Sequence, residues 1–173
     1  KFDFFSSKFE ATDPSEVTGE IRRNFIVETA EYVSGKKQFA QMFVLEEPMV
    51  LRNISLALHC FGGEGDLWVN IADDQQGQPS GNTYASQKVR ISYQPSSAGY
   101  DWTDFKFDHQ DLLLTPGKYW ISLNYSGSPI VNWFYSYGKP VGPVEGTRSR
   151  KWDDGNWGSI LSFEFNYRIN GLS

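Results

Sequence analysis

Apolar and polar residues alternate along most of this chain, and that alternation restricts its fold more than any other feature. In the segment GKYWISLNY, residues 117–125, the side chains of Tyr119, Ile121 and Leu123 fall on one side of an extended chain. Trp120 and its polar neighbours fall on the other side. A period of two residues is that of a β-strand with one buried face. No segment longer than a few residues has the period of a helix, so we predict an all-β protein.

Alternating segments are separated by stretches rich in Gly, Pro, Asn, Asp and Ser, which turn the chain. The predicted strands are 20–28, 37–46, 50–60, 66–72, 84–93, 100–108, 118–125, 130–137 and 160–169. Strands with no helices between them pair antiparallel, and 173 residues are enough for one domain with a sizeable core.

We therefore predict a single domain over residues 1–173, an antiparallel two-sheet β-sandwich of the jelly-roll type. Residues 1–19 are expected to form a lead-in arm or edge strand. Residues 138–158 are expected to form a long irregular loop, and loops of that length are usually functional or mobile.

The acidic composition argues against several partners. The net charge is −5 and the isoelectric point is about 5.0, so phosphate backbones and anionic membranes are repelled. No apolar run approaches the roughly 18 residues of a membrane span, and no signal peptide is present. Because the chain opens KFDFF without a methionine, we expect a mature or excised fragment of a larger protein.

Catalytic chemistry has little support in the residues. Cys60 is predicted to be buried, and the adjacent His59 points to the opposite face of its strand, which argues against a Cys–His pair. Neither His59 nor His109 has a partner at the spacing of zinc ligands. The chain has no nucleophile elbow, phosphate loop or dinucleotide fingerprint. Asp104 and Glu164 are outward carboxylates that a glycosidase would need in one cleft, but isolated strand carboxylates are more often solvated or paired. We predict that the protein is not an enzyme.

Two acidic segments are candidates for a hard cation. Asp73 and Asp74 precede QQGQPSG, and Asp153 and Asp154 lie in the predicted long loop. Calcium takes six to eight oxygen ligands, and neither segment matches an EF-hand. The simpler interpretation is that the carboxylates cap backbone amides in Asx-type turns. A structural calcium with ligands shared between loops is the alternative, and no other cofactor is expected.

Tryptophan on polar strand faces is the strongest functional signal. Trp68, Trp102 and Trp120 each share one side of a predicted strand with polar residues. An indole ring offers a flat apolar face and one N–H donor. Such rings, bordered by Asn, Asp, Lys and Ser, suit the C–H faces and hydroxyl edges of pyranose sugars. The predicted ligand-binding residues are Trp68, Asn70, Trp102, Asp104, Trp120, Asn124, Tyr137, Trp152 and Trp157.

A structural interpretation of the same tryptophans stays open. The arm of residues 1–19 or the loop of residues 138–158 could cover them and form a secondary hydrophobic cluster. Trp157 is the more structural of the two loop tryptophans and Trp152 the more exposed. We expect Trp68 and Trp152 to contact a ligand in preference to Trp120. The three strand tryptophans share a site only if their strands belong to one sheet.

The order of motifs over residues 38–171 resembles the jelly-roll modules of bacterial secreted and cell-surface proteins, including choice-of-anchor modules. The motifs are QMFVLEEPMVLRNISLALHC, LWVNIADDQQGQPSG, WTDFKFD, LLLTPGKYWISLNY and NWFYSYG. They carry no catalytic signature, and similar sandwiches include many non-catalytic carbohydrate-binding modules. The resemblance transfers no binding residue, because such modules place their sites on different faces and loops.

These observations together predict a non-catalytic carbohydrate-binding module of a larger extracellular or cell-surface bacterial protein. Its partners would be a polysaccharide or oligosaccharide and covalently linked neighbouring domains, with no nucleic acid and no membrane insertion. A structural or adhesive cell-surface sandwich without a sugar ligand is the alternative. A β-sandwich glycosidase or lyase is the third possibility.

Overall fold

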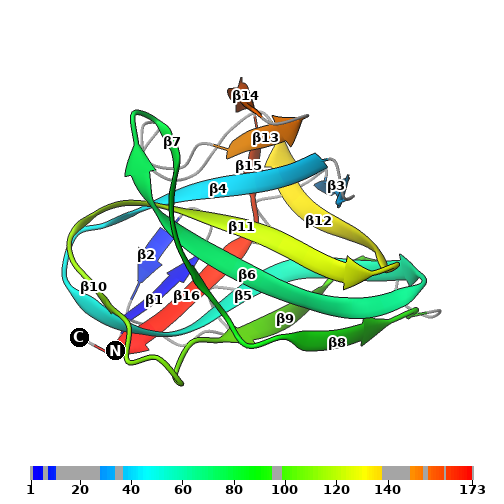
Figure 1. The fold of residues 1–173 in the computed structure, drawn as a ribbon, viewed down its shortest axis with the longest axis horizontal. Helices are drawn as coiled ribbons and strands as arrows, with labels where there is room; N and C mark the ends of the chain where they lie inside the picture. Colours follow the sequence, from blue (N-terminus) through cyan, green and yellow to red (C-terminus); the bar gives the residue numbers. More distant parts are fainter. Residues whose placement is uncertain are drawn as a thin grey trace.

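A computed structural model shows two antiparallel β-sheets packed face to face (Figure 1). The structure describes residues 2–5, 8–10, 28–33, 37–94, 99–137, 149–153, 156–161 and 163–172. Every regular element within these ranges is a strand, and none is a helix that could cross a membrane. The prediction of an all-β two-sheet sandwich is confirmed, and the jelly-roll type stays a prediction.

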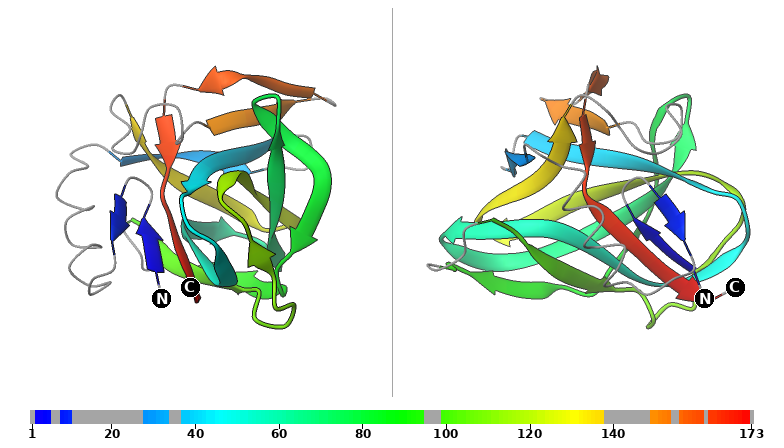
Figure 2. Two further views of the ribbon diagram at one scale, coloured as in Figure 1. Left: turned by 90° about the vertical axis from the view of Figure 1, so that its left-hand side faces the viewer. Right: turned by 180° about the vertical axis from the view of Figure 1, so that it is seen from behind.

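We call the two sheets sheet A and sheet B. The strands of sheet A are β1 (Phe2–Phe5), β2 (Lys8–Glu10), β3 (Glu28–Val33), β5 (Met49–Gly62), β9 (Asp101–Lys106), β10 (Leu113–Leu114), β12 (Ile130–Tyr137), β15 (Phe163–Phe165) and β16 (Tyr167–Leu172). Their order is β15-β12-β5-β16-β1-β2, with β9 and β10 also paired to β5 and β3 to β12. Seen from behind in Figure 2, β5 and β16 lie in front, and β1 lies beside β16.

Sheet B faces the viewer in Figure 1. Its strands are β4 (Lys37–Leu45), β6 (Glu64–Gln75), β7 (Gln78–Ala85), β8 (Val89–Ser92), β11 (Gly117–Gly127), β13 (Ser149–Asp153) and β14 (Asn156–Leu161). The order is β14-β13-β4-β11-β6-β7, and β8 also pairs with β6. The central strands β4, β11 and β6 come from distant parts of the sequence, so the sheet gathers residues that the chain separates widely.

The core lies between the sheets and is built from the alternating apolar positions. Residues 67, 69 and 71 of β6, residues 119, 121 and 123 of β11, and residues 54, 56 and 58 of β5 belong to one buried cluster, as their alternation predicts. Trp133 stacks on Phe165 at 4.2 Å between ring centroids, and its indole N–H donates to the Asn166 carbonyl at 3.1 Å. A buried tryptophan with a satisfied N–H contributes its whole ring area to the core.

Two turns that connect the two sheets lie close together at one end of the sandwich, and glycine makes this possible. A Cβ on Gly65 of β6 would lie 2.1 Å from the Ser126 carbonyl oxygen in β11. The Ser128 N–H donates to the Glu64 carbonyl at 3.1 Å, which joins the β5–β6 turn to the β11–β12 turn. The backbones are too close for any side chain at position 65, so glycine is required there.

Two predicted strands are divided in the structure. Segment 84–93 forms the end of β7 and then β8. At Ser86 the backbone N–H still donates to the Val69 carbonyl at 2.8 Å, but the Val69 N–H donates to the Ser86 hydroxyl at 2.9 Å instead of to a backbone carbonyl. Segment 160–169 contributes to β14 in sheet B and to β15 and β16 in sheet A. Alternation continues through both breaks, which is why sequence alone joins them.

The expected loop over residues 138–158 is wrong in part. Residues 149–153 form β13, which pairs with β4 and extends sheet B, and residues 156–158 begin β14. Residues 138–148, 154 and 155 lie outside the described residues. The predicted strand 20–28 also lies outside them, except for residue 28, where β3 begins.

Candidate functional site

The outer face of sheet B gathers four of the predicted ligand-binding residues, Trp68, Asn70, Trp120 and Asn124. Each of the four follows and precedes a core position of β6 or β11, which directs its side chain away from the core. In the pairing of β11 with β6, Asn124 lies opposite Trp68 and Ser122 lies opposite Asn70. The prediction that polar residues border a tryptophan on one face therefore holds for Trp68.

A row of polar contacts runs across this face at Trp68. Gln38 of β4 donates from its side-chain amide to the Asn124 Oδ1 at 2.7 Å, and Asn124 donates to the Ser122 carbonyl at 3.4 Å. On the other side of Trp68, the Lys88 ammonium lies 5.1 Å from the centroid of the indole ring. We call Gln38, Asn124, Trp68 and Lys88 the Trp68 row.

Asn70 lies one position further along β6 on the same face, about 7 Å from Trp68 at the usual rise of a strand. Its side chain and that of Ser122 are half-buried. The Asn70 amide makes no hydrogen bond to any other described residue. It therefore presents one donor group and one acceptor to anything that stacks on Trp68.

Trp120 lies on the same face but is buried, with only 1% of its surface exposed. It packs with Ala40 and Met42 of β4, and Trp157 of β14 packs against this cluster. The Trp120 N–H donates to Asp74 Oδ1 at 2.8 Å. The prediction that Trp120 contacts a ligand is wrong, because its ring and its N–H are both occupied within the protein.

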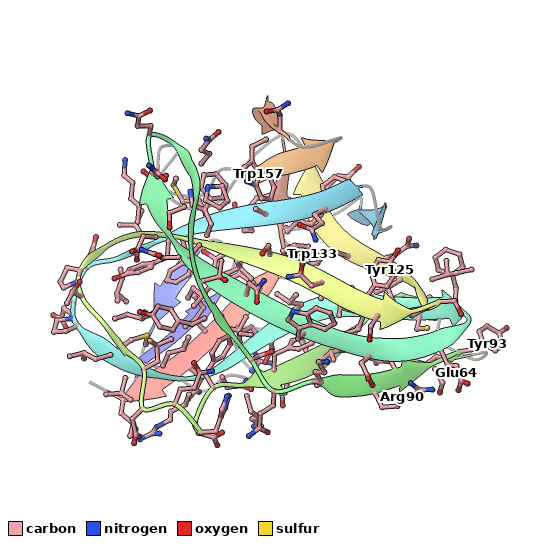
Figure 3. All side chains as sticks on the ribbon, in the orientation of Figure 1. Glu64, Arg90, Tyr93, Tyr125, Trp133 and Trp157 are labelled. Atoms are coloured by element: carbon pink, nitrogen blue, oxygen red, sulfur yellow. The ribbon has the colours of Figure 1, made fainter. Side chains whose placement is uncertain are left out.

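Trp157 is half-buried against the same cluster, which agrees with its predicted structural character. Figure 3 shows the side chains on this face, with Trp157 labelled close to β4 and β13. We call Ala40, Met42, Trp120 and Trp157 the Trp120 cluster. Within this cluster the Trp120 ring is enclosed and offers no stacking surface, whereas Trp157 is half-buried.

The Asx-turn interpretation is confirmed for Asp74. Its Oδ2 accepts from the Gly77 N–H at 3.4 Å, in a β6–β7 turn where Gln76 and Gly77 have φ angles of 54° and 81°. Asp73 points to solvent. Among the described residues no group of three His, Cys, Asp or Glu could hold a metal ion. The side chains of Asp153 and Asp154 lie outside the described residues, and a structural calcium stays a prediction.

Trp102 and Asp104 lie on β9 in sheet A, so they do not share a face with Trp68. The Arg168 guanidinium lies 5.1 Å from the Trp102 ring centroid, and Tyr100 packs edge-on against that ring at 5.7 Å. The Asp104 carboxylate accepts from the Ser55 hydroxyl and, at 3.3 Å, from the Asn53 amide. The condition for a site shared by the three strand tryptophans is therefore not met, because β9 lies in sheet A and β6 and β11 lie in sheet B. Alternation gives the face of a strand but not its sheet.

Two further predicted ligand residues have described backbones only. Trp152 of β13 pairs with Gln38 and with Trp157 in sheet B, so its backbone continues the Trp68 row towards the edge. Tyr137 of β12 pairs with Phe163 in sheet A. Their side chains lie outside the described residues.

The residues considered for catalysis differ in burial and in their contacts. Cys60 is buried, and its thiol donates to the Gly62 carbonyl at 3.3 Å. His109 is exposed, whereas Glu164 is 1% exposed instead of solvated as its outward position suggests. Burial, together with the charge of Glu164, raises the pKa of the Tyr167 hydroxyl well above its ordinary value.

Sequence reasoning missed Gln38 and Lys88 as members of the row. Gln38 is an outward residue of a predicted strand, but its contact with Asn124 depends on the pairing of β4 with β11, 86 residues away. Lys88 lies in the break between β7 and β8, which alternation did not detect. No protein-family model and no curated protein matches this sequence. The assignment of the site therefore depends on its geometry.

Proposed function

We propose that the protein is a non-catalytic carbohydrate-binding module and that its site is the outer face of sheet B at the Trp68 row. The observation that carries the proposal is the position of Trp68. Its half-buried ring lies on a polar face, with Asn124 opposite it and Asn70 two residues along the strand.

The chemistry of this face matches that of a sugar. A pyranose ring stacks its C–H face on an indole, and its hydroxyl groups exchange hydrogen bonds with amide side chains at the ring edge. Asn70 supplies an amide without an internal partner among the described residues. Asn124 is buried, and its amide is engaged by Gln38 and by the Ser122 carbonyl. It therefore fixes the polar surface beside Trp68, and a surface positioned before binding loses less entropy when the ligand arrives.

The affinity of one such site is expected to be weak. One stacked ring contributes about 1 kcal/mol, so a few contacts give dissociation constants of roughly micromolar to millimolar order. Attachment to neighbouring domains that hold the same polysaccharide would strengthen binding through effective concentration. This fits a module of a larger secreted or cell-surface bacterial protein, which the resemblance of the framework motifs supports.

The test is affinity gel electrophoresis of the protein in gels that contain a panel of neutral and charged polysaccharides. Trp68→Ala is expected to abolish retardation by any glycan that retards the native protein. Trp102→Ala is the matched control, because it removes the same ring from the outer face of sheet A and is expected to keep retardation. Far-UV circular dichroism of each variant establishes that it is folded. If no glycan retards the native protein, or if Trp68→Ala is retarded equally, the proposal is wrong.

A second candidate is a structural or adhesive domain without a sugar ligand. The burial of Trp120 and the packing of Trp157 favour it, because they show that tryptophan on this face can serve stability alone. A reducing-sugar assay on the same panel addresses the enzyme alternative, since sugar release would replace a binding module with a glycosidase.

A further inference from the structure

We infer that the Trp68 row selects a negatively charged sugar, one that bears a carboxylate or a sulfate ester. This inference rests on the proposed function, because it names the class of ligand for the same site. It begins from Lys88, whose ammonium lies 5.1 Å from the centroid of the Trp68 ring.

The Lys88 charge is not neutralised by a neighbouring carboxylate. The nearby acids of β6 are Glu64 and Asp66, and both pair with Arg90 of β8, at 3.4 Å and 3.8 Å. Lys88 itself has no carboxylate partner among the described residues. Its contact is the indole ring, and its side chain is exposed.

A neutral sugar and a charged sugar would meet this arrangement differently. A neutral ring that stacks on Trp68 must displace the Lys88 ammonium and lose the cation–π contact, with only a hydroxyl to replace it. An anionic sugar displaces the same contact but gives the ammonium a charge-assisted hydrogen bond, which is about twice as strong as a neutral one. The site therefore favours the anionic ligand.

Because the whole protein is acidic, selection of a negatively charged sugar would have to come from a particular site. At a net charge of −5 the protein as a whole repels polyanions. Non-specific attraction is thus not expected to hold a polyanion on this protein, and retention by one would report a particular cation. Lys88 lies over the Trp68 ring in sheet B, as Arg168 lies over the Trp102 ring in sheet A, so variants at Lys88 and Trp68 identify which cation is responsible.

The experiment compares two matched pairs of polymers in affinity gels. Polygalacturonate is compared with its methyl ester, and dextran sulfate with dextran, so that the members of each pair share a sugar backbone and differ in the charged substituent. We expect the charged member of at least one pair to retard the native protein more strongly, and the pair that responds identifies carboxylate or sulfate. Raising the salt concentration should weaken that retardation, because the ammonium is exposed.

Three variants locate the effect. Lys88→Gln is expected to weaken retardation by the charged polymer by about 10-fold, as the loss of one charge-assisted hydrogen bond implies. Lys88→Arg should retain it. Lys118→Gln is the matched control, since Lys118 is an exposed lysine on the same face of sheet B, outside the Trp68 row, and it should also retain retardation.

The outcomes separate the inference from the proposed function. Equal retardation by the charged and neutral members, lost in Trp68→Ala but unchanged in Lys88→Gln, would overturn the selection of anionic sugars and leave sugar binding in place. Retardation by no member of either pair would overturn the selection of anionic sugars. Retardation by no glycan of the wider panel, or retardation that persists in Trp68→Ala, would overturn the proposed function as well.

Discussion

Trp120 and Trp68 lie on the same face of sheet B, on neighbouring strands, but their surroundings differ. They are separated by the length of about four residues, roughly 13 Å along the strands. Trp120 is buried with Ala40 and Met42 and donates its N–H to Asp74. Trp68 is half-buried among polar side chains and lies beneath Lys88.

The difference shows that cross-strand neighbours decide whether an outward tryptophan is structural. Trp120 lies opposite Met42 on one side and Ala72 on the other. Met42 offers an apolar surface to the ring, and the small Ala72 leaves room for it. Trp68 lies opposite Asn124, which Gln38 already engages. Apolar neighbours let the sheet bury the Trp120 ring, whereas polar neighbours leave the Trp68 ring half-buried.

The largest expected effect concerns the stability that each ring provides. Trp120→Ala should lower the free energy of unfolding by about 3–5 kcal/mol, because it removes a buried ring and leaves a cavity. Trp68→Ala should lower it by about 1 kcal/mol, since part of the Trp68 ring is already exposed to solvent. Urea denaturation followed by circular dichroism measures both. Equal losses of unfolding free energy in the two variants would contradict the distinction between the buried Trp120 and the half-buried Trp68.

The next largest expected effect on stability comes from substitution of Asp74, which accepts the hydrogen bond from the Trp120 N–H. Asp74→Ala should lower the free energy of unfolding by about 2 kcal/mol, because the buried indole N–H and the Gly77 N–H both lose their acceptor. Asp74→Asn keeps an acceptor oxygen and should cost less. The control is Asp73→Ala, whose exposed side chain should change stability by no more than about 0.5 kcal/mol. A loss in Asp73→Ala as large as that in Asp74→Ala would show that loss of the β6–β7 turn charge, not the indole bond, is responsible.

The strand faces could be predicted from the sequence because alternation depends on the local chain alone. It predicted the inner positions of β5, β6 and β11 correctly, and it predicted that Trp68 and Trp120 point outward. It could not predict the exposure of those rings, which the register of β4 and β6 against β11 determines. It also could not predict that β9 carries Trp102 into the other sheet.

Solvation of the outward positions was predicted less well in sheet A than in sheet B. Ser55 and Ala57 of β5 point outward by alternation and are nevertheless buried, as are Glu164 and Asn166. Ser55 donates to Asp104 of the neighbouring β9, so its hydroxyl is satisfied without water. Alternation therefore predicts the direction in which a polar side chain points. Whether that side chain contacts water depends on the residues that pack against it.

The smallest expected effect tests whether the hydrogen bond between Gln38 and Asn124 organises the Trp68 row before a ligand binds. Gln38→Ala removes the amide that donates to Asn124 at 2.7 Å and should lower the free energy of unfolding by about 1 kcal/mol. It should also weaken retardation by a binding glycan severalfold, because Asn124 would no longer be fixed beside Trp68. Gln78→Ala is the control, since Gln78 is exposed on β7 and outside the Trp68 row. If Gln38→Ala lost stability but bound glycan as the native protein does, the hydrogen bond would stabilise sheet B without organising the site. A loss of binding with unchanged stability would instead place Gln38 in direct contact with the sugar.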